Sequence, residues 1–123
     1  VQEAAGTGGI TNLPTPDAIG VIAMGGTAGK VALVMTTTII GGQGITDTNV
    51  VDFIGYGVSA SSCEGAPVGG CVAALRFAPA PSNTNADFRL GSGCTDTNVN
   101  SADFFVATPS PRNSSAALNV CVP

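Results

Sequence analysis

The sequence has few charged residues and lacks both histidine and tryptophan. Only 10% of its 123 residues are charged, whereas charged residues make up about a quarter of an average soluble domain. The net charge is −4, and the four basic residues are scattered along the chain. Binding a nucleic-acid backbone needs clustered Lys and Arg, so this composition argues against a nucleic-acid partner.

Long apolar runs are also missing. A membrane-spanning helix needs about 18 or more apolar residues, and the run at residues 31–40 is too short and is broken by three threonines. We therefore expect no membrane span. Because the sequence starts with Val1 rather than Met, we expect that an N-terminal portion, including a secretion signal, has been removed or is not represented.

Motifs that carry enzymatic chemistry are absent. The serines within residues 59–62 have no histidine to activate them and no G-x-S-x-G turn around them. The glycines at 41–44 lack the Lys-Ser/Thr of a phosphate-binding loop. Asp52 and Glu64 could form a catalytic acid pair, but we favour the interpretation that each carboxylate only accepts hydrogen bonds within the fold. The sequence therefore predicts a protein that is not an enzyme.

Four cysteines are present: Cys63, Cys71, Cys94 and Cys121. Their number is even, no histidine accompanies them, and no C-x-x-C spacing occurs, so disulfides are a better explanation than zinc. Disulfides indicate an oxidising, extracellular compartment. Of the three possible connectivities, we favour Cys63 with Cys71 and Cys94 with Cys121, because each pair closes a glycine-rich or turn-rich segment.

The strongest strand signal is VVDFIGYG at residues 50–57. β-Branched and aromatic residues favour a pleated, buried strand, and Gly55 and Gly57 mark places where another segment comes close or the strand bends. We predict a central strand here, buried on both faces. Further strands are predicted at residues 21–24, 31–36, 71–77, 86–90, 102–107 and 116–122.

These strands are short, turns separate them, and no helical periodicity occurs. The pattern predicts one all-β domain over residues 1–123, a β-sandwich of short antiparallel strands stapled by disulfides.

Several phrases resemble, in their order, those of bacterial secreted lamin-tail-like domains. They are VDFIGYG (51–57), CEG (63–65), APAPSNT (78–84), GCTDTN (93–98), ADF (102–104) and TPSPRNS (108–114). The resemblance implies an exported immunoglobulin-like β-sandwich, used as an accessory module beside nucleases, phosphatases or surface proteins. Two features depart from the family: its upstream strands are absent, and VGGCVAALRF (68–77) interrupts the usual path.

A sandwich without its opening strands would expose apolar side chains and an unpaired strand edge, which another chain can pair with. We therefore predict a non-enzymatic extracellular or cell-surface protein with a structural or adhesive role. Its partners would be copies of itself, assembled into an oligomer or filament by strand complementation. The alternative is an accessory domain of a larger secreted hydrolase or nuclease, which binds calcium or an extracellular polymer.

One segment has the spacing of a calcium loop. In D-x-N-x-N-x-x-D, oxygens of the four residues could surround a calcium ion, the candidate cofactor. The four residues are Asp96, Asn98, Asn100 and Asp103. The segment lacks the glycine and the bidentate glutamate of the full loop pattern. Asx-turns at the entry of a strand are the favoured explanation.

Overall fold

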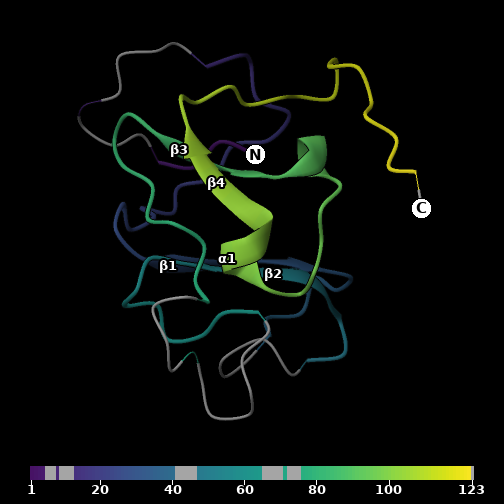
Figure 1. Ribbon diagram of the computed structural model, residues 1–123. Helices are drawn as coiled ribbons and strands as arrows, with labels where there is room; N and C mark the ends of the chain where they lie inside the picture. Colours follow the sequence, from purple (N-terminus) through teal and green to yellow (C-terminus); the bar gives the residue numbers. More distant parts are fainter. Residues whose placement is uncertain (5–7, 9–12, 41–46, 65–70, 72–75, 123) are drawn as a thin grey trace.

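Two small antiparallel sheets form the framework of this computed structural model, which describes residues 1–4, 8, 13–40, 47–64, 71 and 76–122 (Figure 1). Within these residues, β1 pairs with β2 and β3 pairs with β4. Helix is limited to single turns. The elements are β1 (Gly29–Val34), β2 (Val50–Tyr56), β3 (Ala86–Arg89), the 3-10 turn η1 (Gly91–Gly93), α1 (Asn100–Asp103) and β4 (Phe104–Ala107).

Strand β2 lies at the centre, as its sequence predicts. Phe53 and Tyr56 are 4% and 5% exposed and belong to the core of the described residues. A side chain at Gly55 would meet the backbone oxygen of Ser62 at 2.0 Å, and Gly57 has a φ of +71° that favours glycine. Both glycines therefore have the roles expected of them. Burial on both faces is only partial, since Val51 is 53% exposed.

The two edges of β2 are paired in different ways. One edge pairs with β1 in antiparallel register, with Val31 opposite Ile54. On the other edge, the side-chain amide of Asn100 accepts a hydrogen bond from the Gly55 N–H (2.8 Å) and donates one to the Phe53 carbonyl (2.9 Å). Beyond it, Ala78 forms a parallel bridge to Tyr56. One amide side chain thus stands where a neighbouring strand's peptide group would be.

The second sheet meets the first through charged side chains. Phe88 and Phe105 are cross-strand partners on one face, with ring centroids 5.9 Å apart. Strand alternation therefore turns Asp87 and Arg89 to the other face. There Arg89 forms an ion pair with Asp52 of β2 at 2.5 Å, which joins the two sheets.

The predicted strands at 86–90 and 102–107 correspond to β3 and β4, but the second begins later than expected. Ala102 and Asp103 belong to the helical turn α1, because the Asp103 carboxylate accepts hydrogen bonds from the N–H groups of Thr97 and Val99 and draws the chain into a turn. The strand proper starts at Phe104.

Two other predicted strands do not form as expected. Residues 21–24 form no strand. The chain around Gly20 runs parallel to the N-terminal residues: the Gly20 N–H donates a hydrogen bond to the Gln2 carbonyl, and the Ala4 N–H donates one to the Ile22 carbonyl. The predicted strand at 31–36 corresponds to β1, which begins earlier, at Gly29, and pairs with β2. Residues 116–122 also form no strand. Most of the predicted strand at 71–77 lies outside the described residues.

Both disulfides join the pairs that the sequence favoured. Cys63 is bonded to Cys71 and Cys94 to Cys121, with Cα atoms 5.7 Å and 5.3 Å apart. No cysteine is free. Among the described residues, there is no helix with the length and apolar character that crossing a bilayer requires.

Asn100 provides a test of this edge pairing. Replacing Asn100 with Ala leaves the buried Gly55 N–H and Phe53 carbonyl without partners, so we expect a loss of about 3 kcal/mol in the free energy of unfolding. Urea denaturation measures the loss. The control is Ser101→Ala, an exposed neighbour on α1, for which we expect a change within about 0.5 kcal/mol. Equal stability of the two variants would contradict the role given to Asn100.

Candidate functional site

Among the described residues, three acidic side chains lie close together. Glu64, Asp96 and Asp103 each place a carboxylate oxygen within 4.8 Å of the others. Glu64 follows Cys63, Asp96 lies in the loop after η1, and Asp103 ends α1. We call these three residues the acidic cluster. Asp96 and Asp103 are close in the sequence, whereas Glu64 comes from a distant part of the chain and joins them only in the folded protein.

Asp103 is the most buried member of the acidic cluster, with a relative exposure of 0%. Its carboxylate accepts hydrogen bonds from the Thr97 N–H (3.0 Å), the Thr97 hydroxyl (2.7 Å) and the Val99 N–H (3.3 Å). These bonds satisfy the carboxylate and fix the loop of residues 97–99 around it. The role of Asp103 is therefore already structural before any ligand is considered.

A guanidinium group balances part of this negative charge. Arg89 lies 2.5 Å from Asp52 and 3.5 Å from Asp96, and its side chain is 13% exposed. It also donates a hydrogen bond to the Thr95 carbonyl and stacks over the Phe104 ring, 4.6 Å from the centroid. Removing one partner from such a poorly solvated arrangement costs much more than an exposed ion pair contributes.

Two carboxyl groups, Glu64 of the acidic cluster and Asp87 of β3, are harder to ionise than usual. Burial, together with the charges of Asp52, Asp96 and Asp103, raises the pKa of Glu64 to about 7, although Arg89 acts in the opposite direction. Burial also raises the pKa of Asp87 to about 6. One oxygen of Asp87 is buried without a hydrogen-bond partner among the described residues. Each group therefore keeps its proton to a higher pH than an exposed carboxyl group does.

The pair of Asp52 and Glu64 considered from the sequence is brought together here, since Asp52 is one of the charges that raise the pKa of Glu64. Asp52, however, is bonded to Arg89, and Glu64 accepts a hydrogen bond from the Asn100 amide at 3.1 Å. Both carboxyl groups thus serve as hydrogen-bond acceptors within the fold.

The four residues of the predicted calcium loop do different things in the structure. Asp96 and Asp103 lie in the acidic cluster. The Asn100 oxygen accepts hydrogen bonds from the N–H groups of Gly55 and Glu64, and its nitrogen faces Glu64. The Asn98 N–H donates a hydrogen bond to the Asp96 carboxylate in an Asx-turn, and the φ of Asn98 is +57°. The sequence considered Glu64 only with Asp52 and did not single out Arg89, because no sequence spacing links either residue to residues 96–103.

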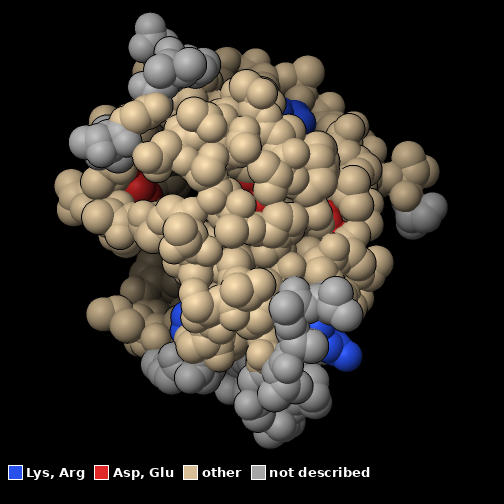
Figure 2. All heavy atoms as spheres, turned by 60° about the vertical axis from the view of Figure 1, so that its left-hand side comes forward, with Lys and Arg blue, Asp and Glu red and all other residues tan. Residues whose placement is uncertain are grey.

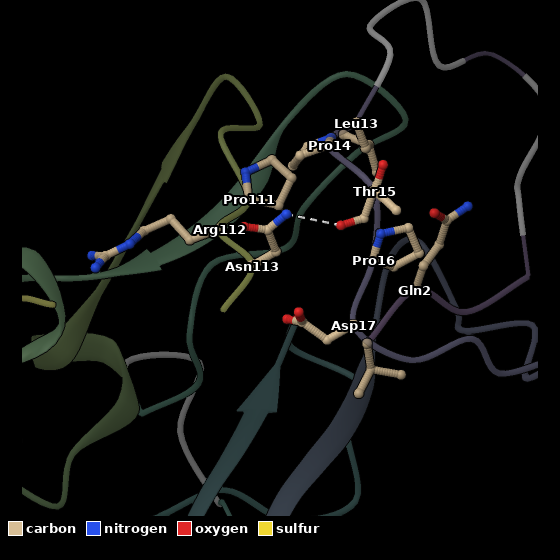
Figure 3. A pocket seen from close by; sticks show the side chains of 10 residues that line it. Gln2, Leu13, Pro14, Thr15, Pro16, Asp17, Pro111, Arg112 and Asn113 are labelled. Atoms are coloured by element: carbon tan, nitrogen blue, oxygen red, sulfur yellow. Dashed lines mark hydrogen bonds between the residues drawn. The ribbon is translucent and has the colours of Figure 1, made fainter. Parts of the chain in front are cut away.

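The described residues also line two hollows away from the acidic cluster. One, of about 60 Å³, is lined by Pro14, Pro16 and Pro111, and the Asn113 amide closes it by donating a hydrogen bond to the Thr15 carbonyl at 2.9 Å (Figure 3). The other, of about 520 Å³, is an open hollow beside Phe77 and Pro79. Neither contains a carboxylate of the acidic cluster, so the hollows and the cluster are separate features.

No family model, no curated protein and no solved structure matches the chain.

The raised pKa values predict an unusual dependence of stability on pH. Between about pH 4.5 and pH 7 the folded protein binds more protons at Glu64 and Asp87 than the unfolded chain does, so stability falls as pH rises. We expect the free energy of unfolding to fall by on the order of 2 kcal/mol from about pH 5 to about pH 8, allowing for partial solvent screening. Urea denaturation across this range measures it.

The double variant Glu64→Gln/Asp87→Asn should flatten this decline, because neither amide titrates. Asp47→Asn is the matched control. Hydrogen bonds from Asn49 lower the pKa of Asp47, so it titrates below this range and its removal should leave the decline intact. A wild-type protein whose stability is constant or rises from about pH 5 to about pH 8 would contradict the prediction.

Proposed function

We propose that this protein is a non-enzymatic, secreted structural or adhesive module, which assembles with copies of itself into an extracellular oligomer or filament by strand complementation. Its two small sheets would then form part of an immunoglobulin-like sandwich of the lamin-tail type. The motif order resembles that family, and the two disulfides suit an extracellular location.

The observation that carries the proposal is that β1 exposes apolar side chains beside an edge with which no described strand pairs. Cross-strand partners share a face, so Val31 lies on the face of Ile54, and alternation places Leu33 on the same face. Yet Val31 and Leu33 are 46% and 61% exposed, while the neighbouring Tyr56 is 5% exposed. No described strand pairs with the outer edge of β1. Exposed apolar side chains beside an edge with which no described strand pairs are what an added strand covers.

The surface composition supports the same function. Figure 2 shows a face on which charged atoms are few and widely separated among uncharged ones. Many large apolar side chains are exposed across the described residues, among them Ile19, Val21 and Met35 at 79%, 89% and 75%. A surface with so little charge and so much apolar area favours contact with other protein over dispersion in water.

Leu33 tests the proposal. A charge at this position would have to be desolvated when a strand covers β1, so Leu33→Lys should raise the apparent Kd of self-association by about 100-fold. Light scattering coupled to size exclusion, with electron microscopy of the wild-type protein, measures the change.

The control is Val58→Lys, which adds the same charge at a position that is 71% exposed and lies beyond the end of β2. It should assemble as the wild type does. A wild-type protein that stays monomeric at high concentration would refute assembly.

The acidic cluster favours a second candidate, an accessory domain that binds calcium. Three carboxylates within 4.8 Å supply the oxygen ligands that calcium prefers. Two features weaken this candidate: Arg89 already supplies a cation beside Asp96, and the Asp103 oxygens already accept hydrogen bonds.

If calcium binds the cluster, millimolar calcium should raise the Tm of the wild-type protein but not that of Asp96→Asn, since binding to the folded state alone stabilises it. Asp47→Asn, which removes an exposed carboxylate elsewhere, should keep the response. Equal Tm values with calcium and with chelator in the wild type would leave the cluster purely structural.

A further inference from the structure

The C-terminal segment of residues 116–122 has the character of a strand without a sheet. Leu118, Val120 and Val122 are 91%, 78% and 89% exposed. The intervening residues hold the segment to the domain: the Asn119 amide donates to the Ser92 carbonyl at 3.1 Å, and Cys121 is bonded to Cys94. Alternate side chains therefore point in opposite directions, as in a β-strand. We call residues 116–122 the tail.

The tail's backbone is available for pairing. Among the described residues, no backbone hydrogen bond is formed by the N–H or carbonyl groups of residues 118–122, and the segment runs outward from the body of the molecule (Figure 1). Unpaired backbone groups and a row of apolar side chains are what a strand contributes when it joins a sheet edge. The disulfide to Cys94 holds the tail in place and reduces the entropy that ordering it would cost.

The outer edge of β1 is a matching acceptor. It has six residues, and its exposed Val31 and Leu33 are spaced two residues apart, as are the apolar residues of the tail. The tail contains no charged residue, and strand alternation places Lys30, the charged residue of β1, on the face opposite Val31 and Leu33. Pairing would remove the three apolar tail side chains, Val31 and Leu33 from water, which favours association.

We infer that the tail is the donor strand of the assembly and pairs with the outer edge of β1 in a second copy of this chain. The inference rests on the proposed function and adds which segment joins which edge. Donor and acceptor are different surfaces, so the contact is head-to-tail, and each copy keeps one free donor and one free acceptor for further growth.

Three variants test the assignment by light scattering. Leu118→Lys/Val120→Lys removes the apolar row of the donor, and Leu33→Lys blocks the acceptor; each should weaken self-association by about 100-fold. Ile19→Lys/Val21→Lys is the matched control, because it adds the same charges to two equally exposed apolar residues outside the tail. It should assemble normally.

Mixing the two blocked variants is the sharpest measurement. The Leu33→Lys chain keeps an intact tail, and the Leu118→Lys/Val120→Lys chain keeps an intact β1 edge. An equimolar mixture should therefore form a one-to-one dimer that grows no further, although each variant alone is monomeric. Hydrogen exchange of the assembled wild type should show new protection in residues 29–34 and 118–122, a readout that does not depend on the variants folding.

The outcomes separate the two proposals. Assembly of the wild type that survives the tail substitutions, or protection confined to other segments, overturns the donor assignment and leaves self-assembly standing. If assembly is lost in Ile19→Lys/Val21→Lys and kept in the tail variant, the donor assignment is wrong, and residues 19–21 are the contact instead. A wild-type chain that never associates overturns both.

Discussion

Two hydrogen bonds between the Asn100 amide and the backbone of β2 hold the structure together. They attach the turn α1, and with it β4, to the central strand, and the same amide reaches Glu64 beside the Cys63 disulfide. Three separate parts of the chain thus meet at one side chain that is 0% exposed. A strand in its place would supply many more backbone bonds, so the structure depends heavily on this residue.

The interior formed around this contact is unusually polar. Among the described residues, the largest fully buried side chains are Asn100, Asp103, Cys63 and Ser62, while the apolar core is limited to a few residues around Phe53 and Tyr56. Arg89 compensates the carboxylates between the sheets, and the disulfides close two loops. The exterior, in contrast, includes many exposed apolar side chains, among them those of β1 and of the tail. Together these features favour a fold that is completed by neighbouring molecules.

The sequence predicted the parts of the fold that depend on local chemistry. β-Branched and aromatic residues identified β2, and the alternation in ADFRL identified β3 with Asp87 and Arg89 on one side. Boundaries were less accurate where a side chain redirects the backbone, as Asp103 does at the start of β4. Residues 21–24 were predicted as a strand because they are apolar, but their backbone has no strand partner in the described structure. Of the acidic cluster, Asp96 and Asp103 were visible from their spacing, and Glu64 was not.

Composition and local pattern determined the all-β class, the absence of a basic surface and the preferred cysteine pairs, because these follow from residue types and their near neighbours. Only the tertiary structure decided that Glu64 lies against Asp96 and Asp103, that Arg89 joins the sheets and that β1 exposes apolar side chains beside an edge with which no described strand pairs. These features depend on contacts between residues far apart in the chain, and which surfaces remain uncovered is known only after every such contact has formed.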